Sequence, residues 1–395
     1  MIRSARSSHF IVSLATVFVT GLGVWSCKTP APDNSAELLN RETPVEEPAL
    51  EIDAGVGEKQ WPQEVASQQR IAQAVVAMVQ STYDSGHRPA VRDAHPKHHG
   101  CVAASFEMNS SLPDKFQTGV FKPGKSYKAW IRYSNGSADP SQPDIKGDGR
   151  GMAIKIFGVP GEKILGATDE RGTQDFLMIN HPVFFADDPE RYQETIEAAR
   201  NGARLKALIS SGFRGAKEII ALQGIKISNP LQTQYFSMVP YRLGVGAGSK
   251  AVKYSAKPCS VAKDPMPGKD AHPDYLRAAM QNTLSRGDAC FEFMVQVSQD
   301  FNSMPVEDPI TEWSQSKSPF VKVATIHIPK QNFTSDAQQQ FCEQISMNPW
   351  HATAEHRPLG AINRARRVAY EASSKFRHQL NQTPRQEPTG NETFN

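Results

Sequence analysis

Apolar residues recur along the chain with two different periods, and these periods predict its helices and strands. Between residues 65 and 83 they return about every 3.6 positions, which is typical of an amphipathic helix. A second helix is predicted over 190–209, with Asp188 suited to cap it and Pro189 at its first position. A third helix, rich in Arg, is predicted over 360–379. Strands are expected over 102–108, 128–134, 151–157, 175–179, 291–296 and 320–328.

The order of these elements indicates a mixed α+β fold. Few helices separate the strands, so antiparallel pairing is favoured over the crossovers that parallel strands need. Ser335 and Gln338 resemble a capping box before a short helix at 341–345. Residues 210–300 show no clear period. The 39% hydrophobic and 22% charged residues are those of a globular protein, and a net charge of +3 gives no argument for nucleic acid as a partner.

The N-terminus has the pattern of a bacterial export signal over residues 1–26. Arg3 and Arg6 precede an uncharged apolar run over 10–25 that ends before Cys27. This run is short of the ~20 residues that a transmembrane helix needs. Cys27 follows a small residue, as lipidated cysteines do in bacterial lipoproteins, although Trp25 is unusual there. We therefore expect a periplasmic or membrane-anchored lipoprotein; plain secretion and an uncleaved anchor are the alternatives.

Composition predicts two disordered segments around one folded domain. Residues 27–60 mix Pro with Glu, Asp and Asn and have little to bury, so we expect a tether. Residues 379–395 are mostly polar and are expected to be a disordered tail. The folded domain is thus predicted over 61–378.

Four cysteines remain after Cys27, which in an exported protein permits two disulfides with three connectivities. Four buried free thiols are the alternative. No Cys-x-x-Cys-His sequence occurs, so a haem would not be covalently attached by that route. The four are Cys101, Cys259, Cys290 and Cys342.

The last predicted helix carries a candidate metal ligand. Arg366 and Tyr370 are four residues apart and share a face, and Arg377 returns to that face two turns later. A phenol with a pKa of about 10 is a poor ligand unless its anion is favoured. Fe(III) and a guanidinium both favour that anion, and an Arg fork suits a haem propionate. The alternative is an exposed basic helix whose Tyr packs on the core.

Two further polar residues could take part in chemistry at such a metal. His95 could transfer a proton, although His95-Pro96-Lys97-His98-His99 could also be a metal-binding loop or a plain surface loop. Asn180 could orient a bound ligand, or it could be a turn residue two positions before a Pro. Phe184 and Phe185 follow closely and could be core residues or a cofactor wall.

These residues lie in motifs that occur in a family-specific order. The strongest are Arg92-x-x-His95-x-Lys97, Ile131-Arg132-Tyr133-Ser134, Asp148-x-Arg150-Gly151-x-Ala153-x-Lys155, Asn180-His181-Pro182-Val183-Phe184-Phe185 and Arg366-x-x-x-Tyr370. Weaker matches are Asp308-Pro309 with Trp313, and Glu343-Gln344 before Pro349. Through most of residues 88–378 the chain resembles the haem catalase superfamily.

The resemblance implies a fold, a cofactor and a reaction. The fold would be an antiparallel eight-stranded β-barrel with added helices, and the cofactor haem b. Hydrogen peroxide would be broken down to water and oxygen. A peroxidase or isomerase acting on organic or fatty-acid hydroperoxides is the first alternative, and a non-catalytic haem-binding protein the second. The implied roles are Tyr370 as iron ligand, His95 and Asn180 as catalytic residues, and Arg92, Arg132, Ser134, Phe184, Phe185, Arg366 and Arg377 as haem-pocket residues.

The chain departs from the family pattern at several points. His98-His99 replaces glycine-rich sequence after the distal His, and residues 371–374 lack the Pro-Asp of large catalases. The chain is shorter than those enzymes, and its N-terminal segment does not resemble their dimer-threading arm. These differences predict a haem pocket more open to bulky peroxides. They leave the oligomeric state open, and they suggest no membrane contact beyond a lipid anchor.

Overall fold

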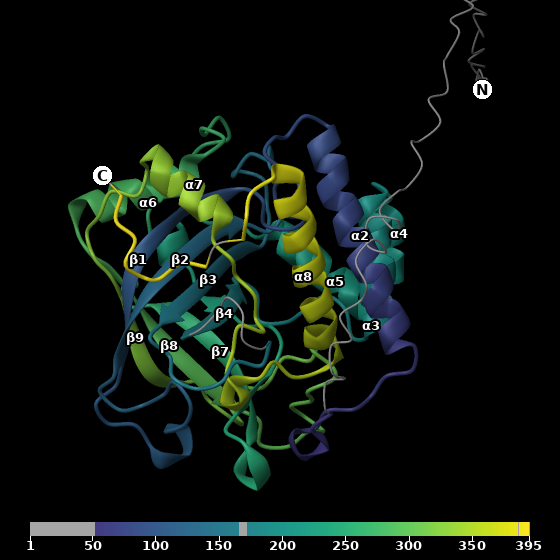
Figure 1. The fold of residues 1–395 in the computed structure, drawn as a ribbon, viewed down its shortest axis with the longest axis vertical. Helices are drawn as coiled ribbons and strands as arrows, with labels where there is room; N and C mark the ends of the chain where they lie inside the picture. The colour runs from purple at the N-terminus through teal and green to yellow at the C-terminus, as the bar shows by residue number, and fades with distance from the viewer. Residues whose placement is uncertain (1–51, 166–171, 386, 395) are drawn as a thin grey trace, which may run out of the picture. The chain divides into compact units, whose positions relative to one another are not determined.

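The structure, a computed structural model, describes residues 52–165, 172–385 and 387–394 (Figure 1). Its strands form one antiparallel sheet in the order β5-β4-β3-β2-β1-β9-β8-β7-β6, and β5 also pairs with β7. That extra pairing closes eight strands into a barrel and leaves β6 at the edge, which confirms the expected eight-stranded architecture. The strands are β1 (His98–Met108), β2 (Ser126–Asn135), β3 (Arg150–Phe157), β4 (Thr173–Ile179), β5 (Tyr235–Phe236), β6 (Tyr241–Leu243), β7 (Lys250–Pro258), β8 (Ala289–Val297) and β9 (Val321–Ile328).

Large aromatic side chains fill the centre of the barrel. Phe176 lies 4.9 Å from Phe293 and 5.1 Å from Tyr254, measured between ring centroids, and Phe106 lies 4.9 Å from Phe293. All four rings are fully buried. The barrel interior is therefore a packed core rather than a pore, as is usual for eight strands.

Helices cover the outside of the barrel. In Figure 1, α2, α3, α4, α5 and α8 lie to one side of it. α2 packs along α8, with Ile71 and Val75 against Ala365 and Ala369. The helices are α2 (Glu64–Asp84), α3 (Pro189–Arg200), α4 (Arg204–Ser210), α5 (Gly212–Gly224), α6 (Tyr275–Arg286), α7 (Asp336–Gln344) and α8 (Ala361–Asn381), with short 3₁₀ turns at Ala54–Val56, Asp114–Phe116, Pro230–Gln232, Gly246–Gly248 and Ala354–His356.

The helix predicted over 190–209 is two helices. Asp188 caps α3 as expected, its side chain accepting from the backbone N–H of Arg191 at 2.8 Å, and Pro189 is the first residue. The chain then turns at Gly202, whose φ of +67° is easily adopted only by glycine, before α4 begins. The predicted capping box is half formed. Ser335 caps α7, but the Gln338 amide donates to the backbone carbonyl of Cys101 instead of returning to the cap.

The folded domain begins earlier than the predicted boundary at residue 61. Glu58 is 2% exposed and binds Arg364 at 2.9 Å and Arg357 at 2.5 Å. Asp53 binds Arg242 at 3.2 Å. The acidic residues that suggested a solvated tether are thus paired with distant arginines. The predicted signal, Cys27 and the rest of the tether lie outside the described residues, so export and lipidation stay predictions. No helix among residues 52–165, 172–385 and 387–394 is long and apolar enough to cross a membrane.

The C-terminal segment differs from the expected disordered tail. α8 continues to Asn381, and Arg385 binds Glu371 at 3.3 Å. Trp130 of β2 donates its indole N–H to Glu392 at 2.8 Å, and Phe394 packs against the same indole with centroids 5.8 Å apart. The polar composition of this segment gave the wrong prediction, because its partners lie on α8 and on the distant strand β2.

The four remaining cysteines form two disulfides. Cys101 pairs with Cys342, which ties β1 to α7, and Cys259 pairs with Cys290 beside β8. The structure selects this connectivity from the three that the sequence allows, and the alternative of four free thiols is wrong.

Candidate functional site

A cavity of about 410 Å³ lies between the barrel and the helices α2, α3 and α8. This volume falls within the roughly 300–1,000 Å³ typical of small-molecule and cofactor sites. Asn180 is the one predicted site residue outside the lining, although its neighbour Ile179 belongs to it. The predicted residues that line the cavity are Arg92, His95, Arg132, Ser134, Phe184, Phe185, Arg366, Tyr370 and Arg377.

Tyr370 reaches the cavity from α8. The Arg366 guanidinium, one turn earlier, donates to the Tyr370 hydroxyl at 3.2 Å and to Asn363 Oδ1 at 3.0 Å. Burial acts to lower the pKa of Arg366, but the facing phenols of Tyr370 and Tyr241 outweigh it and hold that pKa above its ordinary value. A guanidinium that donates to the phenol oxygen would stabilise negative charge on that oxygen when it binds a metal ion.

His95 lies at the end of the segment before β1, with its Nδ1 3.0 Å from the Ser134 hydroxyl. Its φ of +58° is uncommon for a residue other than Gly, and such strained positions occur often at functional sites. Arg132 holds the backbone there by donating to the His95 carbonyl at 2.9 Å. A hydroxyl can both donate and accept, so Ser134 can bond this ring in either of its neutral tautomers.

Burial lowers the pKa of His95 to about 4, and the charge of Arg132 acts in the same direction. The imidazole is therefore neutral at neutral pH. A neutral ring can accept a proton, whereas an imidazolium cannot. His95 is thus available as a base in this cavity.

Glycine at position 151 makes room for His95. A Cβ added there would lie 2.7 Å from Ser134 Oγ and 2.8 Å from His95 Nδ1. Any side chain would displace this pair. The Gly in the β3 motif is therefore explained by the space that the histidine needs.

Asn180 lies directly after β4, and β3 fixes its amide. The Asn180 side-chain Oδ1 accepts from the backbone N–H of Arg150 at 2.6 Å, and the Asn180 backbone N–H donates to the Arg150 carbonyl at 3.0 Å. The Nδ2 group is buried and has no hydrogen-bond partner among the described residues. A buried amide donor without a partner is costly, so it marks a place for an acceptor atom of a ligand. Asn180 and His95 both adjoin Arg150-Gly151.

Phe184 and Phe185 form an aromatic wall of the cavity. Their rings stack with centroids 4.3 Å apart, and Tyr192 of α3 meets Phe184 edge-on at 5.2 Å. Because both Phe rings line the cavity, they serve as a flat apolar surface as well as core residues.

Three arginines meet at one carboxylate, and we call Arg92, Arg132 and Arg377 the arginine cluster. Arg92 and Arg377 each donate to the Glu343 carbonyl at 2.8 Å and approach its carboxylate at 3.0 and 3.3 Å. Arg132 lies 4.0 Å from that carboxylate. Burial, and then the charge of Arg92, lowers the pKa of Arg377 to about 9 and that of Arg132 well below its ordinary value.

The lowered pKa values indicate that the arginine cluster has too little negative charge around it. One carboxylate faces three guanidiniums, and an Arg guanidinium stays protonated in proteins. A ligand with two carboxylates would balance the excess. Haem supplies two propionates, a flat apolar ring for the Phe184–Phe185 wall and an iron that accepts a phenolate such as Tyr370. The residues present therefore fit this cofactor.

The metal-loop alternative for His95–His99 is not supported. His98 Nε2 lies 3.9 Å from Glu343, and the buried His99 lies 3.9 Å from Asp144. Across the described ranges no group of three or more His, Cys, Asp or Glu side chains could hold a metal ion.

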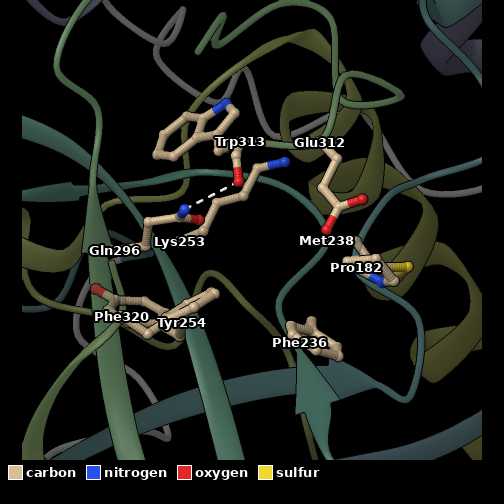
Figure 2. Close-up of a pocket in the computed structure, with 9 residues that line it drawn as sticks. All are labelled: Pro182, Phe236, Met238, Lys253, Tyr254, Gln296, Glu312, Trp313 and Phe320. Atoms are coloured by element: carbon tan, nitrogen blue, oxygen red, sulfur yellow. Dashed lines mark hydrogen bonds between the residues drawn. The ribbon is translucent and has the colours of Figure 1, made fainter. Parts of the chain in front are cut away.

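Figure 2 shows a second, much smaller pocket, which adjoins the cavity through Met238. Its volume is about 10 Å³, roughly the space for one water molecule. Burial lowers the pKa of Lys253 there to about 7, and its ammonium lies 5.1 Å from the Trp313 ring. Gln296 donates to the Trp313 carbonyl at 3.0 Å. This pocket is too small for a substrate, so the chemistry belongs to the larger cavity.

Sequence reasoning missed the role of Glu343. The residue was visible as part of a weak motif, but nothing in the sequence shows that three arginines converge on it. It also missed Asp93, a half-buried cavity residue that accepts from the Ser373 hydroxyl at 2.5 Å. Burial raises the pKa of Asp93. Asp93 lies between two predicted site residues in the first motif, which is the only signal that could have pointed to it.

Comparison with known proteins identifies the family. A family model described as Catalase matches residues 70–208. A catalase-related peroxidase of Mycolicibacterium paratuberculosis is 26% identical over 266 residues, covering 64% of this chain and 79% of that protein. Residues 70–208 match the catalase family, and the chain as a whole is similar to catalases and to a catalase-related peroxidase. The family match includes the segments that carry His95, Ser134, Gly151 and Asn180.

Larger members of the superfamily share the fold. Catalase A of Pseudomonas putida is 22% identical over 310 residues, covering 72% of this chain and 61% of that protein. The structure of catalase A from Saccharomyces cerevisiae superposes with a TM-score of 0.60 at 18% identity, covering 80% of this chain and 67% of the yeast chain. The chain thus spans about three fifths of the Pseudomonas catalase, and at this identity the structural likeness shows the fold alone.

The convergence on Glu343 leads to a stability prediction. Glu343→Gln should lower the free energy of unfolding of the haem-free protein by about 2 kcal/mol, measured by urea titration. Loss of one partner of a buried pair costs about 3–5 kcal/mol, and Glu343 keeps 18% of its side chain exposed. The control is Glu292→Gln, which breaks a surface pair with Lys322 that should contribute less than about 1 kcal/mol. Equal losses in the two variants would contradict the role of Glu343.

Proposed function

We propose that the protein is a haem b enzyme that converts hydrogen peroxide to water and oxygen. The observation that carries the proposal is the Arg366–Tyr370 pair in the same cavity as a neutral His95. Tyr is an uncommon axial ligand of haem iron and is the one that catalase uses. Similarity to the catalase family supports peroxide as the substrate class.

The chain's own residues have defined roles in this proposal. Haem iron, when bound to Tyr370, would supply the redox chemistry at the O–O bond. Arg366 donates to the Tyr370 oxygen and would stabilise negative charge on it when it binds iron, and the arginine cluster would bind the propionates. His95 takes a proton from one peroxide oxygen and returns it to the other, acting first as base and then as acid. Asn180 donates from Nδ2 and orients the peroxide. Two peroxide molecules give two waters and one oxygen.

Purified protein loaded with haem tests this reaction directly. Addition of hydrogen peroxide should release one oxygen for every two peroxides consumed. Protein that retains haem with a tyrosinate spectrum, yet releases no oxygen and consumes no peroxide, would contradict the enzyme and leave a haem-binding protein. A neutral His95 argues against that alternative, because binding haem requires no base.

A second candidate substrate is an organic or fatty-acid hydroperoxide. Apolar side chains from α2, α3 and α5 form one part of the cavity lining, namely Val75, Met78, Ile196, Ala199 and Leu222. Such a lining would accept an alkyl chain. A relative of which the chain covers 79% is called a catalase-related peroxidase, which also favours a peroxidase.

Initial rates with two peroxides distinguish the candidates. We expect measurable turnover of cumene hydroperoxide together with modest oxygen release from hydrogen peroxide, since the apolar lining admits the bulky substrate. Both rates are measured on one sample and expressed per haem. Fast oxygen release without any turnover of cumene hydroperoxide would mean a selective catalase, and it would contradict the prediction of an open pocket.

A further inference from the structure

Large apolar side chains are exposed on two adjacent helices, α4 and α5. The exposed fractions are 72% for Leu205, 70% for Ile209, 90% for Phe213 and 59% for Ile220. Leu205 and Ile209 are one turn apart on α4, and Phe213 and Ile220 are two turns apart on α5. Single exposed apolar residues are ordinary, but several on neighbouring helices mark a surface that contacts another molecule.

Basic residues accompany these apolar side chains. Residues 200–226 contain six Lys or Arg and one acidic residue, Glu218, which binds His181 at 2.8 Å. Arg214 is neutralised by Asp308 at 2.9 Å. In the part of the chain that the structure describes, the exposed Arg204 and Lys206 have no carboxylate partner, whereas the exposed Lys217 lies 3.7 Å from the Glu218 carboxylate. We define the α4–α5 face as Leu205, Ile209, Phe213 and Ile220 with Arg204, Lys206 and Lys217.

The α4–α5 face adjoins the cavity. α5 contributes Leu222 to the cavity lining, and α3, against which α4 packs, contributes Ile196 and Ala199. In Figure 1 these helices lie together on the α8 side of the barrel. One layer of helices therefore separates whatever covers the face from the apolar part of the lining.

We infer that the α4–α5 face docks on the surface of an anionic phospholipid bilayer. Interfacial helices combine a Phe- and Leu-bearing apolar side with Lys and Arg beside it, and this face has that composition. Its excess positive charge is complementary to anionic headgroups and gives no reason to attract a second copy of the same basic face. The inference goes beyond the proposed function, since it needs neither haem nor a reaction.

Docking in this way has a consequence for substrate supply. It would bring the apolar part of the cavity lining to the level of the lipid, where hydroperoxides of acyl chains are produced. This consequence rests on the proposed function, whereas the docking itself does not. Binding and turnover are therefore measured separately, so failure of one is distinguishable from failure of the other.

Tryptophan probes with brominated lipids test the docking. Full-length protein carrying Leu205→Trp or Phe213→Trp is mixed with phosphatidylglycerol vesicles whose acyl chains are brominated. Bromine quenches only a tryptophan in contact with the chains, so fluorescence added by each substitution should fall at least about twofold. The matched control is Val261→Trp, which replaces a residue that is 93% exposed outside the face. Its added fluorescence should not change.

Charge reversal tests the headgroup preference. Arg204→Glu with Lys206→Glu should raise the phosphatidylglycerol concentration for half-maximal quenching of the Phe213→Trp probe by at least about tenfold. Lys263→Glu with Lys269→Glu changes net charge equally on exposed residues elsewhere and should leave that concentration unchanged. Phosphatidylcholine vesicles should quench the probe far less.

Three results would overturn the inference. Equal quenching at residues 213 and 261 would mean that the vesicle contacts no particular face. Equal effects of the two charge reversals would mean that net charge alone drives binding. Shielding of the Phe213→Trp probe from acrylamide before vesicles are added would mean that a second copy or residues 1–51 already cover the face.

Discussion

Tyr370→Phe should abolish the high-spin ferric tyrosinate absorbance spectrum and remove most of the bound haem. Phenylalanine has no oxygen to bind iron, and Arg366 would then face the cavity without the phenol that accepts from it at 3.2 Å. Arg366 keeps its bond to Asn363, so the helix should remain folded. The measurements are the visible spectrum and the haem content per chain after purification. Far-ultraviolet circular dichroism checks the fold.

Tyr192→Phe is the matched control for this ligand assignment. Tyr192 is a second buried tyrosine of the cavity, and burial holds the pKa of its phenol well above its ordinary value. A phenol that resists ionisation is a poor iron ligand, so Tyr192→Phe should retain the tyrosinate spectrum. Unchanged spectrum and haem content in Tyr370→Phe, or their loss only in Tyr192→Phe, would reassign the ligand.

Periodicity predicted the long elements of the fold well. The helix expected over 65–83 is α2 (Glu64–Asp84), and the strand expected over 128–134 is β2 (Ser126–Asn135). These elements bury one face over many residues, so the sequence repeats the signal several times. β5 and β6 have two and three residues, which is too few for any period to appear. The closure of the barrel by β5 was accessible only through the family resemblance.

Long-range pairing explains the errors at the two ends. Glu58 and Arg364 are 306 residues apart, and both are charged, so the sequence alone suggests that each is exposed to solvent. Only the folded chain brings them together and buries them. The same holds for Trp130 and Glu392, which lie 262 residues apart. Local composition shows which residues are costly to bury because they are charged. It does not show which distant residue pairs with them and offsets that cost.

The candidate site was predicted residue by residue because its motifs, taken in order, resemble those of a known family, whereas each residue alone also had an ordinary structural interpretation. Arg366-x-x-x-Tyr370 places donor and acceptor on one helix face whatever surrounds them. Glu343 has no such local signature, since its position at the arginine cluster depends on α7 and α8 meeting the segment before β1. Asn180 was predicted as a cavity residue, but its neighbour Ile179 lines the cavity and Asn180 does not.

The second large effect is expected for His95→Ala, which should keep haem and lower the rate of peroxide breakdown by a factor of about 10²–10⁴, the usual contribution of acid–base catalysis. The His95 side chain bonds Ser134 but neither Tyr370 nor the arginine cluster, and Arg132 donates to the His95 backbone carbonyl, which alanine keeps, so the haem content should be unchanged. The two measurements are the rate of oxygen release, which should fall, and the haem content per chain, which should stay normal. His98→Ala is the control, because His98, the first residue of β1, lies three residues further along the chain and outside the cavity lining.

The pH profile of the unmodified enzyme provides an independent check on this base. His95 acts while its ring is neutral, and burial lowers its pKa to about 4. The rate should therefore stay constant from about pH 8 down to pH 5 and fall as the pH drops through about 4, because protonation then removes the base. An exposed histidine would lose its base form near pH 6.5 instead. A rate that already falls between pH 7 and 6, or His98→Ala matching the loss in His95→Ala, would move the proton-transfer role away from His95.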